Sequence, residues 1–90
     1  MLAPIYTKQF SKDVKKFKKR KKNLEKLKII VRTLLQGESL DALHRDHKLV
    51  GDYKDRRECH IEADWLLIYK VTKEFIIFER TGTHSDLFGK

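Results

Sequence analysis

An arginine and a histidine lie four residues apart near the end of this chain, within the stretch FERTGTHSDLF that runs from Phe78 to Phe88. Arginine keeps its positive charge at every physiological pH, whereas histidine gains or loses a proton near neutrality. Arg80 and His84 are therefore suited to act together on a phosphate. The other groups that could join them are three histidines and an aspartate, namely His44, His47, His60 and Asp64.

RNA cleavage is the phosphate reaction that this set fits best. The 2′-hydroxyl of RNA can serve as the nucleophile, so the protein must supply only a base, an acid for the departing 5′-oxygen, and positive charge for the phosphate. Histidine and aspartate suit the first two roles, and arginine suits the third. A simpler role for Arg80 is a salt bridge at a strand end, with Glu58, Glu62 or Asp64 as its partner.

Other catalytic arrangements fit the chain less well. Its histidines and its single cysteine show neither His-x-x-x-His nor Cys-x-x-Cys spacing, so we expect no metal site and no other cofactor. Cys59 and His60 are neighbours in a predicted strand and would point to opposite faces, so they cannot form a nucleophile–base pair. We expect Cys59 to lie in the core. No serine lies in the turn that serine hydrolases use for their nucleophile.

Positive charge is concentrated in one segment of the chain. The net charge is +8, and residues 8–32 hold 12 of the 21 Lys and Arg but only two acids. The other residues hold nine Lys and Arg and 11 acids. Such a segment is typical of a surface that binds a polyanion, and a solvated face that keeps the protein soluble is the alternative. The residues that we expect to bind RNA or the ribosome are Lys15, Lys18, Lys19, Arg20, Lys22 and Lys26.

The N-terminal segment predicts a short edge strand and two helices. The strand covers Ala3 to Tyr6, and a first helix follows from about Lys8. Its apolar residues repeat at helical spacing, at Phe10, Val14 and Phe17. The apolar residues of the second helix are Leu24, Leu27, Val31 and Leu34. Asn23 can cap the start of this helix, and Gly37 can end it.

The C-terminal half has the pattern of an antiparallel sheet. Arg56 to Glu62 alternates, while Leu66 to Val71 and Phe75 to Arg80 are apolar runs joined by a short hairpin turn at residues 72–74. Gly51 to Tyr53 could add another short strand. In the last strand, regular alternation would place Ile76, Phe78 and Arg80 on one face.

These elements predict one α+β domain over residues 1–90, built in two layers. A short N-terminal strand would precede a basic helical hairpin at residues 8–36, an antiparallel sheet at 50–82, and a C-terminal tail at 83–90 that carries catalytic residues. No apolar run is long enough to span a membrane, and no secretory signal is visible. We therefore expect a cytoplasmic protein with no membrane partner.

Three stretches of the chain resemble the YafQ branch of the RelE/ParE toxin superfamily. They are DHKLVG (Asp46 to Gly51), RRECHIEADWLLIYK (Arg56 to Lys70) and FERTGTHSDLF. The N-terminal FSKDVKKFKKR and the leucine pattern of the second helix resemble it too, so the likeness covers nearly the whole chain.

The resemblance implies a type II toxin that cleaves mRNA on the ribosome without a metal, in a RelE-like, microbial-ribonuclease-like fold. It further implies a cognate antitoxin as partner, and contact with operator DNA only through the antitoxin complex. Two other functions remain as alternatives: a non-catalytic toxin that blocks DNA gyrase, as ParE-like members do, and a plain RNA- or ribosome-binding module.

Six residues of this chain match the active-site positions of the family: His47, His60, Asp64, Arg80, His84 and Phe88. The roles that we expect are the scissile phosphate for Arg80 and the leaving-group proton for His84. His47, His60 and Asp64 would share base duty and orientation, and Phe88 would stack on a base or shape the pocket.

The residues around these positions raise three further expectations. Trp65 either borders the site or packs in the core, and His44 is expected at the surface. Related sequences often have proline after the first motif histidine and before the aspartate, where this chain has Lys48 and Ala63. Losing a fixed φ at those positions should loosen each loop and lower catalytic efficiency.

Overall fold

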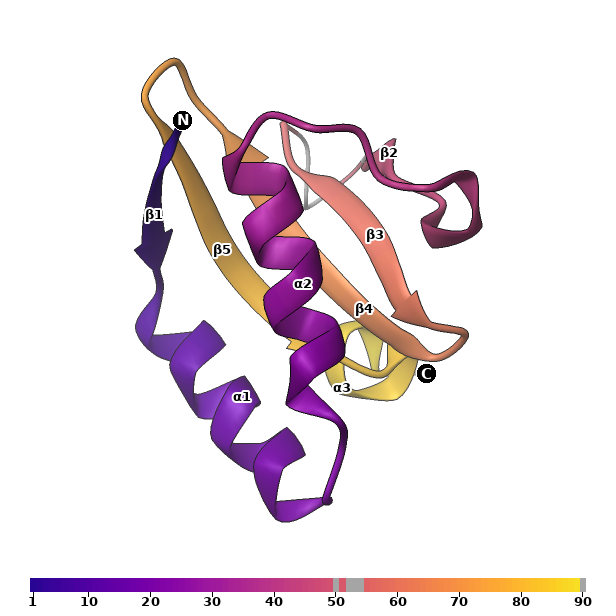
Figure 1. Cartoon of the computed structure of the whole chain (residues 1–90). Helices are drawn as coiled ribbons and strands as arrows, with labels where there is room; N and C mark the ends of the chain where they lie inside the picture. Colours follow the sequence, from indigo (N-terminus) through magenta and orange to yellow (C-terminus); the bar gives the residue numbers. More distant parts are fainter. Residues whose placement is uncertain (50, 52–54, 90) are drawn as a thin grey trace.

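The computed structural model describes residues 1–49, 51 and 55–89 and shows one mixed sheet with helices. The elements are β1 (Ala3–Tyr6), α1 (Lys8–Lys19), α2 (Leu24–Leu35), the 3-10 helix η1 (Ala42–His44), β2 (His47–Lys48), β3 (Arg57–Glu62), β4 (Trp65–Val71), β5 (Phe75–Gly82) and α3 (His84–Phe88). Within the described ranges, the strand order is β1-β5-β4-β3-β2. β1 runs parallel to β5, and the other neighbours are antiparallel (Figure 1). The predicted α+β class is therefore confirmed.

α1 begins where the sequence predicts, and α2 both begins and ends where it predicts. Thr7 caps α1 by accepting a hydrogen bond from the Phe10 backbone N–H, and Asn23 caps α2 through the Glu25 N–H. Gly37 follows the last turn of α2 with φ of 75°, a left-handed conformation that glycine adopts without strain. No helix in the described ranges has the length and apolar character needed to cross a membrane.

The main core lies between the helices and one face of the sheet. α2 crosses this face, and α1 lies beside the end of β5 (Figure 1). Phe10 and Phe17 of α1 are buried in it, as are three residues of α2. Strand residues facing them include Cys59, Ile61, Trp65, Leu67, Tyr69, Ile76 and Phe78. The expected core position of Cys59 is confirmed, because its side chain is fully buried.

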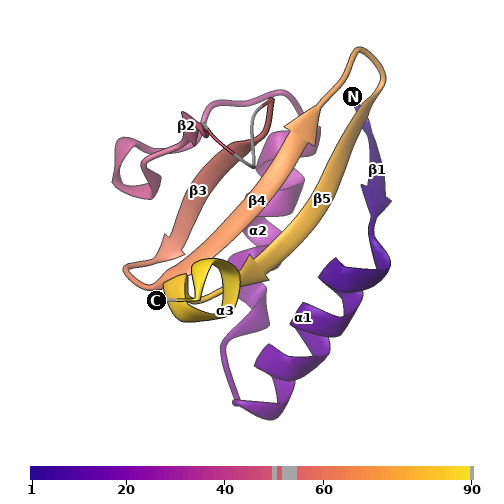
Figure 2. The ribbon, with the colours of Figure 1, turned by 180° about the vertical axis from the view of Figure 1, so that it is seen from behind.

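The opposite face of the sheet carries a second, smaller cluster. Leu66 and Ile68 of β4 pack there with Leu87 of α3, and Leu49 lies against them. Figure 2 shows α3 crossing the end of β4 and β5 on this side, while α2 lies behind the sheet. We call this surface the α3 face. Much of it is left uncovered by helices in the described part of the chain.

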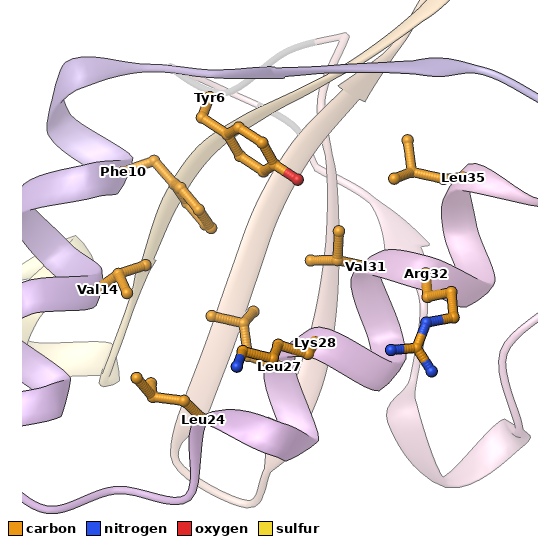
Figure 3. A pocket seen from close by; sticks show the side chains of 9 residues that line it. All are labelled: Tyr6, Phe10, Val14, Leu24, Leu27, Lys28, Val31, Arg32 and Leu35. Carbon is orange, nitrogen blue, oxygen red and sulfur yellow. The ribbon is translucent and has the colours of Figure 1, made fainter.

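An apolar groove lies on the helix side, between α1 and α2. Its volume is about 390 Å³, and its walls include Tyr6, Val14, Leu27 and Leu35. Figure 3 shows these side chains converging from β1, α1 and α2. None of the six predicted catalytic residues lines the groove, so the predicted chemistry lies elsewhere.

A bulge in β5 overturns the predicted alternation of the last strand. Tyr69 of β4 pairs with Phe78, but the next residue, Ile68, pairs with Arg80. Glu79 is therefore an extra residue in β5. As a result Phe78 and Arg80 do not share a face: Phe78 belongs to the main core, whereas Arg80 stands opposite a residue of the α3 face.

The sequence assigned no secondary structure to the C-terminal tail, in which residues 84–88 form α3. One other local prediction differs from the structure. His47 and Lys48, expected in a loop, form β2 and pair with β3 at the sheet edge. The strand expected at Gly51 to Tyr53 falls largely on Asp52 and Tyr53, which lie outside the described residues.

Candidate active site

His84 and Asp64 form the centre of the candidate site. His84 is the first residue of α3, and Asp64 lies in the turn between β3 and β4. Asp64 Oδ1 accepts one hydrogen bond from the His84 backbone N–H, at 2.9 Å, and a second from His84 Nδ1. Together these two hydrogen bonds hold the pKa of Asp64 below its usual range, and the bond from the backbone N–H is the larger cause. A carboxylate on Nδ1 leaves Nε2 of His84 to face a substrate.

His60 and Phe88 flank His84. The ring centroids of His60 and His84 are 5.9 Å apart, and those of His84 and Phe88 are 6.4 Å apart. His60 is half-buried on β3, whereas His84 and Phe88 are exposed. His44 Nδ1 donates to the His60 carbonyl oxygen at 2.6 Å, and His44 is half-buried. His44, expected at the surface, is thus partly exposed and also binds the backbone of β3.

The register of the sheet relates these residues to Arg80 and His47. One row across the α3 face reads Arg80, Ile68, Glu58 and His47, and the next row reads Gly82, Leu66 and His60. With strands about 4.8 Å apart, the backbones of Arg80 and His47 lie roughly 15 Å from each other. Arg80 and His47 thus lie at opposite ends of the row beside that of His60, with His47 one strand away from β3 and Arg80 two strands away.

His47 is held at this border by two contacts. Its Nε2 lies 3.0 Å from Glu58 Oε2, and its Nδ1 lies 2.6 Å from the Arg45 carbonyl oxygen. Glu58 is buried, although His47 itself is exposed. Direct contacts therefore join His60, Asp64, His84 and Phe88, whereas His47 contacts Glu58 and Arg45.

Arg80 is bound to a residue that the sequence did not single out. Asp13 of α1 accepts hydrogen bonds from Arg80 Nε at 2.9 Å and Nη2 at 3.2 Å. The acids expected as its partners have other contacts: Glu58 lies against His47, and Asp64 binds His84. Glu62 binds two lysines of the helical hairpin, as described below.

The position of α3 depends on Asp86. Thr83 caps the helix through the Asp86 N–H, and the Asp86 carboxylate accepts from the Thr83 N–H, which completes a capping box. Arg20 Nη1 lies 2.9 Å from the same carboxylate, and Lys16 Nζ lies 3.3 Å from it. The hydrogen bond from Arg20 is the main reason why the pKa of Asp86 lies well below its usual range. α1 therefore fixes the helix that carries His84.

These contacts divide the predicted RNA-binding residues. Arg20 also lies over the Phe17 ring, at 5.1 Å from its centroid, so it packs against α1 while it binds Asp86. Lys22 and Lys26 bind Glu62 at 3.2 and 2.8 Å. The remaining three are exposed and have no ion pair within residues 1–49, 51 and 55–89, namely Lys15, Lys18 and Lys19.

Two residues next to the site are structural. Trp65 is fully buried, packs against Phe17, and donates its Nε1–H to Thr81 Oγ1 at 2.9 Å. Of the two alternatives for Trp65, packing is the one observed. Burial raises the pKa of the Cys59 thiol, which makes it a poor nucleophile.

The sequence patterns did not indicate the site contacts of four residues, Asp13, His44, Glu58 and Asp86, although they did single out His44 and Glu58. Asp13 did carry a signal, because it lies on the apolar side of α1, three residues after Phe10 and four before Phe17. A buried acid on such a face requires a partner. The other three bind partners that are distant in sequence, which spacing does not reveal. Among the described residues, no three His, Cys, Asp or Glu side chains gather as metal ligands.

The arrangement can transfer protons beside a fixed positive charge. Two imidazoles lie in contact with each other, that of His60 and that of His84, which is paired with Asp64. Arg80 supplies a guanidinium from the neighbouring row of the sheet. Asp64, His84 and Phe88 are exposed rather than enclosed in a cavity. This geometry suits a large substrate that lies across the sheet more than a small molecule held in a pocket.

Comparisons with known proteins agree over the whole chain. A family model described as "Bacterial toxin of type II toxin-antitoxin system, YafQ" matches residues 2–89. The mRNA interferase toxin YafQ of Escherichia coli is 48% identical over 85 residues, which cover 93% of this chain and 92% of that protein. The solved structure of E. coli YafQ matches with a TM-score of 0.94 at 44% identity, and YafQ in the E. coli DinJ–YafQ complex with 0.92 at 46%; each match covers 99% of this chain and 100% of the other. The chain therefore belongs to the YafQ family of bacterial toxins from type II toxin–antitoxin systems.

Proposed function

We propose that this toxin is an endoribonuclease that cleaves mRNA on the ribosome, without a metal, using the RNA 2′-hydroxyl as nucleophile. Membership in the YafQ family and the mRNA interferase relative support the reaction class. The observation that carries the proposal is the pair of hydrogen bonds from His84 to Asp64. They orient an imidazole on the open α3 face, beside His60 and one row from Arg80.

His60 and His84 divide the proton transfers in this mechanism. His60 takes the proton of the 2′-hydroxyl as its oxygen attacks phosphorus. The P–O5′ bond breaks, and His84 gives its Nε2 proton to the departing 5′-oxygen. The products are a 2′,3′-cyclic phosphate and a free 5′-hydroxyl, so atoms and protons balance without a nucleophile from the protein.

The other predicted residues support this reaction. Arg80 stabilises the negative charge that builds on the phosphate. Asp64 orients His84 through the two hydrogen bonds that it accepts from this residue. Phe88 is 37% exposed next to His84, so its ring can stack on a base of the bound RNA. His47, at the border of the site, binds the substrate beyond the cleaved bond.

The partners follow from the charge and from the solved relatives. We assign ribosome binding to the exposed lysines of α1, chiefly Lys15, Lys18 and Lys19, because clustered positive charge binds RNA backbones. A ribosomal target places the toxin in the cytoplasm. E. coli YafQ has been solved with DinJ, and we propose a cognate antitoxin for this chain as well. Operator DNA would be contacted only through that complex.

Expression of His84→Ala and Arg80→Ala tests the function. Both variants should relieve growth arrest and lose mRNA cleavage on purified ribosomes by about 100-fold or more, because each removes one transition-state contact. Cleavage by the parent protein should persist in a chelator. Binding to a co-expressed antitoxin, measured by co-purification, serves as the folding control.

Three outcomes would contradict the proposal. Variants that stay as toxic as the parent would show that these side chains do no chemistry. Toxicity without RNA cleavage by the parent would favour the gyrase-blocking alternative. Ribosome binding without cleavage would leave a plain binding module.

A further inference from the structure

Asp13 is a buried acid for which the mechanism above gives no role. Its side chain is 8% exposed, and its carboxylate accepts four hydrogen bonds. Two come from Arg80, one from the Thr81 backbone N–H at 3.1 Å, and one from Gln9 Nε2 at 3.1 Å. Burying an ionised carboxylate is unfavourable unless donors and an opposite charge compensate it. Arg80 supplies that charge.

The fold explains why an acid of α1 reaches this point. β1 ends at Tyr6, and α1 then continues along the outer edge of β5. Thr7 still follows the strand, because its N–H donates to the Phe78 carbonyl oxygen at 3.2 Å. Beyond it, Asp13 accepts from Thr81, whose N–H has no β1 partner at the sheet edge. The Asp13 carboxylate therefore accepts the Thr81 N–H at the edge of the sheet and also binds the side chain of the neighbouring Arg80.

The contact with Arg80 fixes a plane as well as a distance. Asp13 Oδ2 takes the Nε–H and Oδ1 takes an N–H of Nη2, so the carboxylate and guanidinium lie fork to fork. Arginine has a long side chain with many rotamers, and a single ion pair would leave the guanidinium free to rotate. A bidentate contact removes that freedom before the substrate arrives.

We propose that Asp13 is a positioning residue that holds the Arg80 guanidinium in the orientation that receives the scissile phosphate. The inference rests on the proposed function, in which Arg80 stabilises the charge on that phosphate. Asp13 touches no substrate. It acts by keeping the arginine preorganised, which is worth more than a charge that must reorient during the reaction.

The test is single-turnover cleavage by Asp13→Asn. Asparagine keeps the shape and an acceptor for the Thr81 N–H but loses the charge that holds Arg80. We expect the maximal rate to fall by about 10- to 100-fold, the effect of moving a catalytic group by about 1 Å, with half-saturation changed by less than about twofold. Glu79→Gln is the matched control, because it removes an equal charge one residue from Arg80 and breaks the Arg56–Glu79 pair. Its rate should stay within about threefold of the parent rate.

A double variant separates positioning from general destabilisation. In the Arg80→Ala background, Asp13→Asn should cause no further loss, since no guanidinium remains to be positioned. Equal losses in both backgrounds, or a parent-like rate for Asp13→Asn, would overturn the proposal. If Asp13→Asn does not fold, Asp13→Glu takes its place: it keeps the charge but shifts the carboxylate by one methylene. An unchanged rate for Asp13→Glu would then overturn it. Parent-like cleavage by Arg80→Ala would refute the role of Arg80 itself, which is a failure of the proposed function.

Discussion

At the residue scale, the Asp64–His84 pair decides which nitrogen of the histidine can react. The carboxylate receives Nδ1–H, so proton exchange with a substrate is left to Nε2. The same carboxylate receives the His84 backbone N–H. This second bond depends on the conformation of α3, so one acid fixes both the helix and the side chain of His84.

The pKa of Asp64 should reveal these two hydrogen bonds separately. His84→Ala removes the side-chain donor but keeps the backbone N–H, so the pKa should rise only part of the way towards its usual value near 4. His84→Pro removes both donors and should restore that value. Proline suits this position, because it is the first residue of α3 and Thr83 before it is extended, with ψ of 170°. Carboxyl carbon NMR during a pH titration measures the effect.

The sign of this shift also sets its pH dependence. The folded chain holds the Asp64 pKa below its unfolded value, so the pairing stabilises the fold above about pH 4 and is lost as pH falls towards the lowered pKa. Identical titrations for the parent protein and both variants would show that the pair does not form in solution.

At the scale of elements, α1 organises the end of the sheet that carries the candidate site. It supplies Asp13 to Arg80 on β5, and it supplies Arg20 to Asp86 on α3. α3 also fits closely against β5, because a Cβ added at Gly82 would lie 2.8 Å from Asp86 Cβ. α1 is thus fixed relative to β5 and α3, which are distant from it in sequence, before any substrate binds.

Gly82→Ala should therefore damage activity more than its stability cost explains. The added methyl overlaps Asp86 and must displace α3, which costs about 1–3 kcal/mol and moves His84. Gly37→Ala is the control: its site is open but has φ of 75°, so it costs about 1–2 kcal/mol far from α3. Thermal unfolding should show both losses, whereas single-turnover cleavage should fall only for Gly82→Ala. Equal activity in the two variants would show that the fit of α3 is not required.

At the scale of the whole molecule, local sequence signals predicted the elements but not their cross-connections. The helices and β1 followed from apolar spacing and caps, and the fold class followed from their order. The bulge in β5 could not be predicted, because one extra residue at Glu79 does not change the composition of the strand. The family motifs pointed to the residues that we propose as acid and base. The Asp13–Arg80 contact joins residues 67 positions apart, beyond the reach of any local pattern.

The charge of the whole molecule gives the last prediction. Replacing Lys15, Lys18 and Lys19 by glutamine should weaken ribosome association and reduce the slope of log affinity against log salt by about 0.7 for each lost phosphate contact. A control with the same loss of charge replaces Lys8, Lys28 and Lys73, which are also exposed. Sedimentation with ribosomes over a salt series measures both. Equal slopes for the two triple variants would assign the α1 lysines to solubility.

The strand order has a consequence for how the chain folds while it is being synthesised. β5 lies between β1 and β4, yet it is the last strand of the sheet to be synthesised. While the ribosome is still making this strand, β1 has no neighbour, and neither Arg80 nor His84 is in place. A chain built in this order completes the α3 face only after β5 and α3 have been made, so every shorter nascent chain lacks the Asp13–Arg80 and Asp64–His84 contacts.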